Sequence, residues 1–393
     1  MMSGKHLTGY FDYNATTPLS NAVQSAMTMA LDVYANASSA YSLAQESKAL
    51  VTSARASTAE LLGAQSGQVF FTSGGSEANN WAIKSSLARH LNSPGHIITT
   101  AIEHPSVLEP IAYMEREHGF TVTRLAPDTE GRAREEDFLS ALRPDTQLVS
   151  VMYANNETGA LQPIGSILEE ARRRGITSHT DAVQALGKSA LDVRVLMADC
   201  VSFSAHKFYG PKGIGGLYIR QPETLTQLIH GGGQEMGLRA GTENLVAMAG
   251  LASAAQDCKR LLPEWEAHFD RLKHRLVSKL RASGLGIEFN GPLEKTKSVG
   301  NTLNISVPGV RGEALAALLD HKYQTQVSIG SACSNNKRVD LSHVLTAMGL
   351  DTKRIQSAIR ISFGRYTTEE DLDRFVANLE SCTEQLLGMS TTT

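Results

Sequence analysis

Between about residues 60 and 220, short apolar runs typical of strands alternate with amphipathic runs typical of helices, and this alternation limits the fold more than any other feature. Strands separated by helices of this length predict crossover connections and a mostly parallel sheet. The seven strand-like runs are residues 69–72, 96–100, 121–125, 148–153, 176–180, 200–204 and 216–219. The last run follows its predecessor too closely for a helical crossover, so we expect it to be antiparallel.

After about residue 256 the pattern changes to longer helices and fewer strands, which indicates a second, smaller α+β domain. We expect helices at about 263–282, 312–320, 341–348 and 367–387, and strands at 301–307, near 326–328 and at 358–362. A chain of 393 residues is long enough for two domains. We therefore predict a large domain over residues 18–258 and a small domain made of residues 1–17 and 259–393.

Composition excludes several classes of protein. The 37 Lys and Arg residues against 40 Asp and Glu leave no basic surplus for binding nucleic acid. The longest nearly apolar stretch, residues 245–255, is far shorter than the ~20 residues of a membrane span, and the N-terminus lacks the apolar core of a signal peptide. The four cysteines are too widely separated for a metal knuckle or a redox pair. We expect a cytoplasmic protein with no intrinsic metal site.

Chemically active residue types follow five of the predicted strands, at the point where each strand ends. They are the Gly-rich turn with Gly75 and Ser76, then His104, Asn156, Asp181 with Gln184, and finally Ser204, His206 and Lys207. Taken singly, each has a structural interpretation, as a turn, a helix cap or a surface group. Because the carboxyl ends of parallel strands meet at one edge of a sheet, we expect an anion cradle, an imidazole, an amide, a carboxylate and an amine at one site.

Pyridoxal phosphate needs this set of groups: a cradle for its phosphate, a lysine for a Schiff base and a carboxylate beside its pyridine nitrogen. Lys207 is the favoured amine because it directly follows an apolar strand. Lys212 is the alternative, and it lies inside the Gly- and Pro-rich turn that comes next. The sequence therefore predicts a pyridoxal-phosphate site at this edge of the sheet.

The motifs that carry these residues resemble those of the NifS/IscS-type cysteine desulfurases, a branch of the class V aminotransferase-like enzymes. The strings are FTSGGSEANN, TTAIEHPSVL, ANNETGALQPI, HTDAVQALGK, SFSAHKFYGPKGIGG, RAGTEN, GSACS and IRISFGRYTTEE. The resemblance runs from FDYNATTP to the terminal helix, essentially the whole chain. It implies the α/β fold of fold-type-I pyridoxal-phosphate-dependent transferases.

The resemblance also implies a role for each matching residue. Lys207 matches the Schiff-base lysine, Asp181 the partner of the pyridine nitrogen, and His104 the imidazole stacked on the ring. Arg360 matches the arginine that binds the substrate carboxylate. The remaining matches are Gln184 at the ring hydroxyl, Asn156 beside ring and substrate, Gly75, Ser76, Ser204 and His206 around the phosphate, and Thr242 from the neighbouring subunit of a homodimer.

Cys333 distinguishes between the possible reactions. It lies in the polar segment IGSACSNNKRVD, where nearby Lys337 and Arg338 favour a thiolate. By the resemblance, the enzyme converts L-cysteine to L-alanine and transfers sulfane sulfur to Cys333 as a persulfide. An iron–sulfur scaffold protein or a thiolation partner then accepts the sulfur, and Cys333 could contact an iron–sulfur cluster during that transfer. Cys200, Cys258 and Cys382 lack such surroundings and are expected to be inert.

Two alternatives stay open at this stage. One is a selenocysteine lyase or a transaminase of the same class, in which Cys333 is incidental. The other is an inactive homologue that regulates a sulfur-transfer complex, although the retained Lys207, Asp181 and His104 argue against it.

The sequence also departs from the family between residues 33 and 43, where Ala37 and Tyr41 replace the expected proline and histidine.

Overall fold

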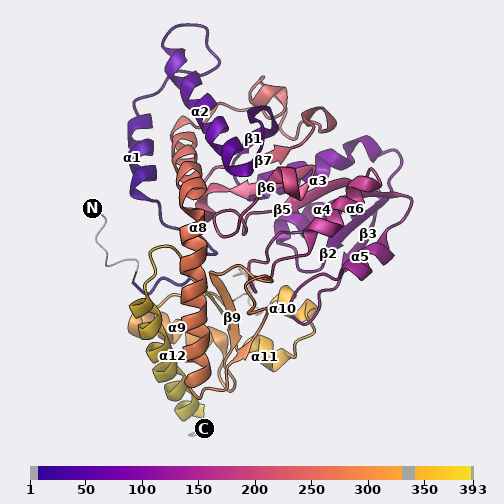
Figure 1. Cartoon of the computed structure of the whole chain (residues 1–393). Helices are drawn as coiled ribbons and strands as arrows, with labels where there is room; N and C mark the ends of the chain where they lie inside the picture. The colour runs from indigo at the N-terminus through magenta and orange to yellow at the C-terminus, as the bar shows by residue number, and fades with distance from the viewer. Residues whose placement is uncertain (1–7, 330–340, 391–393) are drawn as a thin grey trace.

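The computed structural model describes residues 8–329 and 341–390 (Figure 1). In this part of the chain, seven strands form one sheet in the order β1-β7-β6-β5-β4-β2-β3. They are β1 (Val69–Thr72), β2 (His96–Thr100), β3 (Thr121–Leu125), β4 (Thr146–Ser150), β5 (Thr177–Asp181), β6 (Cys200–Ser204) and β7 (Gly215–Ile219). Strands β6, β5, β4, β2 and β3 pair in parallel, whereas β7 pairs antiparallel with both of its neighbours. The predicted mostly parallel sheet with an antiparallel last run is confirmed.

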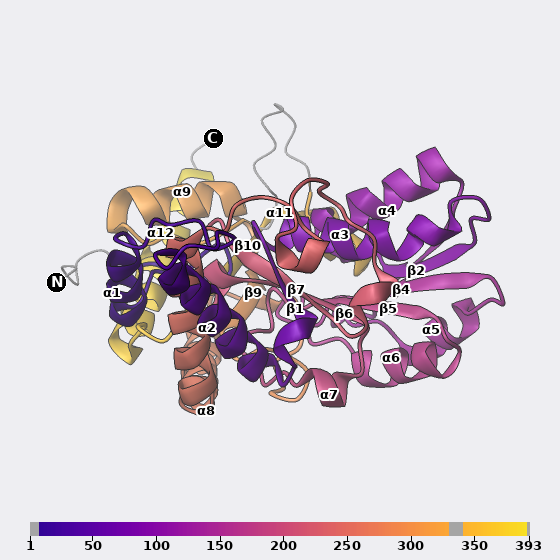
Figure 2. The same ribbon diagram turned by 90° about the horizontal axis from the view of Figure 1, so that it is seen from above.

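Helices cover both faces of this sheet, as Figure 2 shows from above. Helices α3 (Gly75–Leu87) and α4 (Pro105–His118) lie on one face. Helices α5 (Glu135–Ala141), α6 (Ile164–Arg173) and α7 (Val193–Leu196) lie on the other. This two-sided cover explains why strands such as VFFT and CVSFS are buried at every position and lack polar alternation.

The strand order reverses between β2 and β4. From β2 the chain continues outward to β3, but β4 pairs on the other side of β2 and the following strands continue away from it. Ligands of doubly wound sheets bind outside the carboxyl ends of the strands at such a switch point. His104 follows β2 and Asn156 follows β4, so the sequence places both residues at this point.

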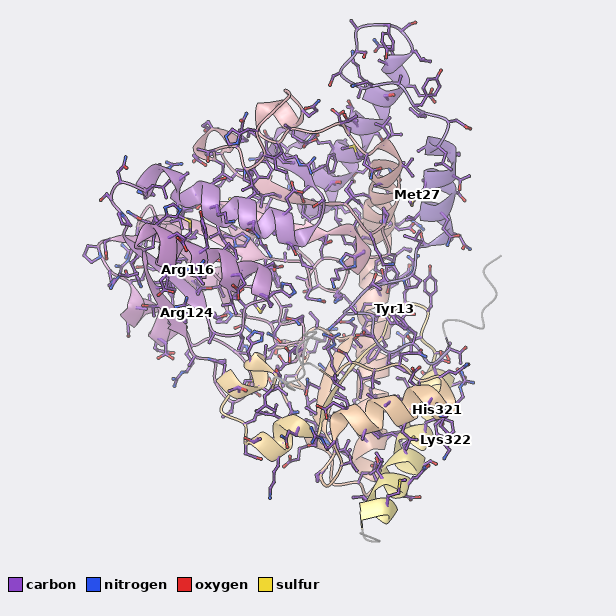
Figure 3. The ribbon with its side chains drawn as sticks, turned by 180° about the vertical axis from the view of Figure 1, so that it is seen from behind. Tyr13, Met27, Arg116, Arg124, His321 and Lys322 are labelled. Atoms are coloured by element: carbon purple, nitrogen blue, oxygen red, sulfur yellow. The ribbon has the colours of Figure 1, made fainter. Side chains whose placement is uncertain are left out.

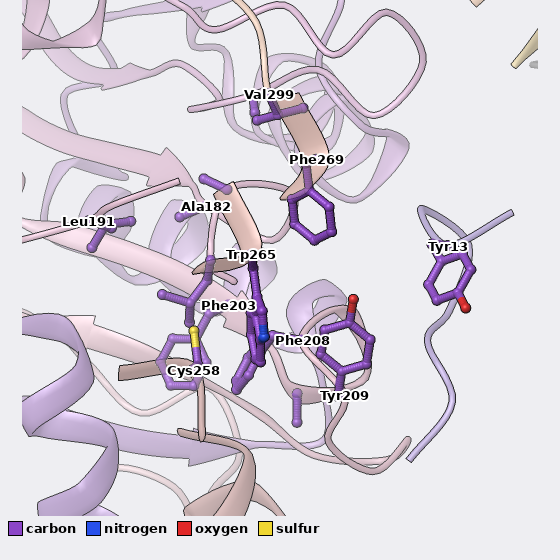
Figure 4. Close-up of a cluster of buried hydrophobic side chains, with 14 of the residues drawn as sticks. Tyr13, Ala182, Leu191, Phe203, Phe208, Tyr209, Cys258, Trp265, Phe269 and Val299 are labelled. Carbon is purple, nitrogen blue, oxygen red and sulfur yellow. The ribbon is translucent and has the colours of Figure 1, made fainter. Parts of the chain in front are cut away.

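The long helix α8 (Leu245–Ala282) runs from the large sheet to the small one (Figure 1). The predicted helix start near residue 263 was wrong, because Pro263 lies inside α8. Proline disfavours a helix interior, but α8 buries apolar side chains on both sides of it, from Leu251 and Cys258 to Trp265 and Phe269. Figure 4 shows Cys258, Trp265 and Phe269 within one cluster of buried side chains. Packing therefore outweighs the local cost of the proline.

Helices α1 (Asn21–Ala30) and α2 (Ala44–Leu62) pack along the first half of α8. Figure 3 shows Met27 of α1 on this side of the molecule and Arg116 and Arg124 near the outer β3 edge. Among the described residues, no helix is long and apolar enough to cross a membrane.

The chain after α8 contributes a second sheet of three described strands. Their order is β10-β9-β8, and both strand pairs are antiparallel. Its strands are β8 (Glu288–Phe289), β9 (Thr302–Ser306) and β10 (Ala358–Ser362), and its helices are α9 (Gly312–Tyr323), α10 (His343–Ala347), α11 (Thr352–Gln356) and α12 (Glu369–Ser390). The predicted strand near 326–328 was wrong. Gln326 and Ser328 make only isolated bridges, to Tyr10 and Arg360, since their partners lie on different segments.

The chain before α1 joins the two sheets. On the small side, the Phe11 carbonyl accepts from Ser362 N, and Tyr13 N donates to the Ser362 carbonyl. On the large side, Thr17 N donates to the carbonyl of His206, just beyond β6. This N-terminal segment therefore positions its side chains between the two sheets, next to the predicted site.

Candidate active site

A cavity of about 350 Å³ lies at the carboxyl edge of the large sheet. It brings together every predicted site residue in the described part of the chain except Thr242. These residues are Gly75, Ser76, His104, Asn156, Asp181, Gln184, Ser204, His206, Lys207 and Arg360. The strand ends and the second sheet thus supply one shared site.

Lys207 lies in a short 3-10 turn directly after β6. Its Nζ donates to the backbone carbonyls of Asn14 at 2.6 Å and Ala15 at 2.7 Å. Burial, assisted by the nearby Arg360 charge, lowers the pKa of Lys207 to about 8. An amine with this pKa is partly neutral near pH 7 and can attack an aldehyde. Lys212, the alternative amine, is exposed and does not line the cavity.

Asp181 ends β5 with its carboxylate fixed from two sides. Oδ1 accepts from Val183 N at 2.9 Å, and Oδ2 accepts from Asn79 Nδ2 at 2.7 Å. Asn79 lies on α3 and also donates to Ser106 Oγ at 2.9 Å. A carboxylate has about four acceptor positions, so Asp181 keeps some for a ligand in the cavity.

His104 is the N-cap residue of α4, and its Nδ1 accepts from Ser106 N at 3.1 Å. Partial burial lowers the pKa of His104 and outweighs the opposite effect of Asp181. Because Nδ1 accepts a backbone hydrogen bond, the hydrogen of the neutral ring is on Nε2. The imidazole is therefore held as a neutral ring that lines the cavity.

The residues of the predicted anion cradle lie around the start of α3. Gly75 is its first residue, and a Cβ at this position would lie 2.7 Å from Val183 Cγ2, so a side chain does not fit. Ser76, Ser204 and His206 complete this side of the cavity. The N-terminus of a 13-residue helix together with hydroxyl groups suits a phosphate. The amine, the carboxylate and the cradle on one cavity fit pyridoxal phosphate.

Arg360 reaches the cavity from β10 of the small sheet and is buried. Its Nη2 donates to Asp12 Oδ1 at 2.6 Å, and its Nη1 donates to the Asn156 carbonyl at 3.0 Å. Its buried Nε has no hydrogen-bond partner among the residues that the structure describes. The guanidinium is thus held in place with a donor left over, which suits recognition of a substrate carboxylate.

Among the described residues, one predicted site residue does not line this cavity, and another prediction falls outside them. Thr242 lines a separate cavity of about 210 Å³ together with Ser73 and Arg239, so its expected role remains a prediction. Cys333 falls outside the described residues, as do Lys337 and Arg338. No group of three His, Cys, Asp or Glu residues within 8–329 and 341–390 could hold a metal ion.

The other three cysteines are buried, as expected of inert residues. Cys200 lies on β6, Cys258 on α8 and Cys382 on α12. Burial raises the pKa of Cys258 to about 12 and also raises the pKa of Cys200 and Cys382. Such thiols remain protonated at pH 7 and are poor nucleophiles.

Four further residues matter to the site, although the sequence predicted no role for them. Asp12 and Asn14 belong to the N-terminal motif FDYNATTP, where two polar side chains among apolar and small ones were a usable signal. Asn79 holds Asp181, as described above. Lys188 follows Gln184 by four residues, a spacing that brings side chains together on a helical turn.

Comparison with known proteins agrees with this geometry. Residues 9–375 match the family described as "Aminotransferase class-V". The chain belongs to this family. It is 41% identical to a cysteine desulfurase IscS of Clostridium botulinum over 97% of this chain and 96% of the relative. It is 40% identical to an IscS of Methanosarcina thermophila over 97% of this chain and 93% of the relative.

Solved structures give the same result. A "NIFS-LIKE PROTEIN" superposes with a TM-score of 0.89 at 38% identity, covering 96% of this chain and 99% of the other. A structure titled "SspA in complex with cysteine" superposes with a TM-score of 0.79 at 34% identity, covering 92% and 100%. Within its family, the chain groups with the cysteine desulfurases that the sequence motifs resemble.

Proposed function

We propose that this protein is a pyridoxal-phosphate-dependent cysteine desulfurase that converts L-cysteine to L-alanine and passes the sulfur to Cys333. One observation carries the proposal: Lys207, Asp181 and Arg360 converge on a single cavity from two different sheets. The names of the relatives support the same reaction.

In the proposed complex, Lys207 would hold the cofactor through its aldehyde carbon, and Asp181 would pair with the pyridine nitrogen. His104 would lie against the ring, Gln184 at the ring hydroxyl and Asn156 beside ring and substrate. When bound, pyridoxal phosphate supplies a conjugated ring that accepts electrons from the α-carbon of the substrate. Gly75, Ser76, Ser204 and His206 surround the phosphate, and Thr242 of the neighbouring subunit contributes to it.

The protein's own residues then bind and orient L-cysteine. Arg360 binds the carboxylate, which fixes the α-carbon near Lys207. Once the substrate amine has replaced Lys207 at the aldehyde carbon, the freed Nζ of Lys207 removes the α-proton, a task that its lowered pKa of about 8 suits. The Cys333 thiolate attacks the substrate sulfur, so the carbon–sulfur bond breaks as the sulfur–sulfur bond forms. The β-carbon takes the proton that the Cys333 thiol gave up, and Lys207 returns the α-proton to the α-carbon. The products are alanine and a persulfide.

The finer assignments are part of the same proposal. The protein acts as a cytoplasmic homodimer and delivers sulfur to an iron–sulfur scaffold or a thiolation partner. Residues 18–258 form its cofactor-binding domain, and residues 1–17 with 259–393 form the small domain. This boundary falls inside α8, which makes the helix the connection between the two domains.

The alternatives lack comparable support. The relatives from Clostridium botulinum and Methanosarcina thermophila carry cysteine desulfurase names, and a transaminase reaction needs no thiol at Cys333. An inactive regulatory homologue would not need a half-buried lysine with a lowered pKa on the same cavity as a fixed carboxylate.

The test is to supply purified protein with L-cysteine and measure alanine and protein-bound sulfane sulfur in equal amounts. Cys333→Ser should retain the visible absorption band of the bound cofactor but form neither product. Cys200→Ser, which removes a buried thiol, is the matched control and should keep turnover. Turnover of cysteine by Cys333→Ser at the wild-type rate would contradict the proposal.

A further inference from the structure

Lys188 is a buried lysine immediately behind the cavity wall. Only 5% of the residue is exposed, and it lies in the turn that follows β5. Its Nζ donates to Asn14 Oδ1 at 2.7 Å and to Gln184 Oε1. The proposed reaction gives this lysine no role, although both of its partners face the site.

The surroundings of Lys188 suit a neutral amine. No carboxylate pairs with Lys188 in the described part of the chain, and its two acceptors are both neutral amides. Burial, assisted by the charges of Lys207 and Arg360, lowers the pKa of Lys188 well below its ordinary value. A neutral amine carries two hydrogens, and Asn14 and Gln184 accept both of them.

These two hydrogen bonds fix which way the Gln184 amide points. Because an amine hydrogen must meet an oxygen, Gln184 Oε1 faces Lys188 and its Nε2 lies on the opposite side. One Nε2 hydrogen goes to the Asn14 carbonyl at 3.0 Å. The residue lines the cavity, and its other Nε2 hydrogen is left for a ligand there. Gln184 therefore presents a donor, rather than an acceptor, to the site.

Asn14 connects Lys188 to the amine of Lys207. Its side chain accepts from Lys188, while its backbone carbonyl accepts from both Gln184 and Lys207. The Nδ2 of Asn14 is used by Thr302 Oγ1 at 2.8 Å and the Asn156 carbonyl at 3.1 Å. With each polar atom of its side chain engaged, Asn14 has one orientation, and Lys188 is one of the groups that set it.

We propose that Lys188 is a positioning residue, which holds Gln184 as a hydrogen-bond donor toward the ring hydroxyl of pyridoxal phosphate. The inference rests on the proposed function, because the ring hydroxyl belongs to the cofactor that Lys207 binds. Lys188 does not touch the cofactor or the substrate and acts through the Gln184 amide.

Lys273 provides a matched control. Only 6% of Lys273 is exposed, and burial lowers its pKa to about 8. Its Nζ donates to Ser298 Oγ at 2.7 Å, and it lines a different cavity beside α8. Substituting Lys273 therefore measures the general effect of removing a buried lysine amine, without any contact to Gln184.

The experiment is a double-mutant cycle on cofactor binding. Apoprotein is titrated with pyridoxal phosphate, and both the dissociation constant and the wavelength of the visible band are recorded for wild type, Lys188→Met, Gln184→Leu and the double variant. We expect Lys188→Met to weaken binding about tenfold and to shift the band, as the loss of one oriented hydrogen bond predicts. In the Gln184→Leu background, the same substitution should change binding less than about twofold.

Lys273→Met should leave both the dissociation constant and the band unchanged. Lys188→Gln retains an N–H donor, so it should bind the cofactor within about threefold of wild type even if Lys188→Met does not fold. The inference would be overturned if Lys188→Met weakened cofactor binding equally in the wild-type and Gln184→Leu backgrounds. It would also be overturned if Lys188→Gln weakened binding as much as Lys188→Met. Neither result would affect the proposed function. A wild-type protein that forms no visible band would overturn the proposed function as well.

Discussion

A half-buried arginine and a buried one in this molecule pair with carboxylates in different ways. Arg55 of α2 makes a two-pronged contact with Glu235, with both N–O distances at 2.8 Å, and Glu235 also accepts from Phe71 N. Arg360 makes a single contact with Asp12 at the cavity, and its buried Nε lacks a partner within the described structure. The Arg55–Glu235 pair uses both carboxylate oxygens, whereas Arg360 keeps an Nε hydrogen that can bond to a ligand.

This difference separates a structural pair from a binding group. A buried charge is stable only when its hydrogen-bonding capacity is used, so an incomplete pair at a cavity indicates a ligand. The same contrast holds between the site, where Lys207 and Arg360 have capacity left for a ligand, and the Arg55–Glu235 pair, whose charged groups bond to each other. Substitutions at the site should change chemistry, and substitutions around Arg55 should change stability.

The largest expected effect is at Lys207. Lys207→Ala removes the amine that joins the cofactor and moves the α-proton, so alanine formation from cysteine should fall about 10⁴-fold or more. The visible band should disappear in the same variant. Lys212→Ala, which removes the neighbouring exposed amine, should keep both. A normal band in Lys207→Ala would place the Schiff base on another lysine.

Arg360→Met tests the incomplete pair directly. Loss of a charged hydrogen-bonded contact to the substrate carboxylate should lower kcat/KM for cysteine about 100-fold. Cysteamine lacks the carboxylate, so the wild-type preference for cysteine over cysteamine should disappear in this variant.

Arg55→Met is the contrasting substitution. It leaves Glu235 buried without its partner and should lower the free energy of unfolding by about 3 kcal/mol. The preference for cysteine over cysteamine should stay at the wild-type value. If Arg55→Met removed that preference, the distinction between the two pairs would be wrong.

A smaller effect concerns the pH dependence of cofactor loading. The attacking form of Lys207 is the neutral amine, and its folded-state pKa is lowered to about 8. The rate at which apoprotein takes up pyridoxal phosphate should therefore rise about tenfold per pH unit below this value and level off above it. Stopped-flow absorbance between pH 7 and pH 10 measures this rate. A rise that continues to pH 10 would mean that burial does not lower this pKa.

The smallest effect is expected at Asp12. Asp12→Asn keeps the oxygen that accepts from Arg360 but removes a negative charge next to the place proposed for the substrate carboxylate. The KM for cysteine should fall about threefold, in line with the modest strength of partly exposed ion pairs. Steady-state kinetics at low ionic strength measure it, and an unchanged KM at 1 M salt is the control. A higher KM at low salt would show that Asp12 mainly orients Arg360.

The large sheet and most of its site were predictable because each strand end is encoded locally. A run of apolar residues followed at once by His104, Asp181 or Lys207 is visible in the sequence, and a parallel sheet brings such ends together. Only the second half of α8, from about residue 263, was predicted as a helix. The helix continues through Pro263 because its buried side chains pack against residues distant in the chain.

The roles of Asn14 and Lys188 could not be read from local pattern. Their hydrogen bond joins residues 174 positions apart, and Asn14 contacts the small sheet at a still larger separation. A single polar residue in an apolar segment has many possible partners, and only the folded chain selects one. Residue types gave the chemistry of the site, whereas its supporting contacts required the structure.

The position of Asn14 has a consequence for biosynthesis. Asn14 N donates to Ser362 Oγ, 348 residues later, while its carbonyl accepts from Lys207. A ribosome releases the chain from its N-terminus, and domains fold as their residues emerge. The contacts of Asn14 with the small sheet therefore cannot form until almost the whole polypeptide has been translated. A nascent chain that has folded its large sheet would still lack Arg360 and this second anchor, so we expect the proposed vitamin-derived cofactor to be captured only when synthesis is nearly complete.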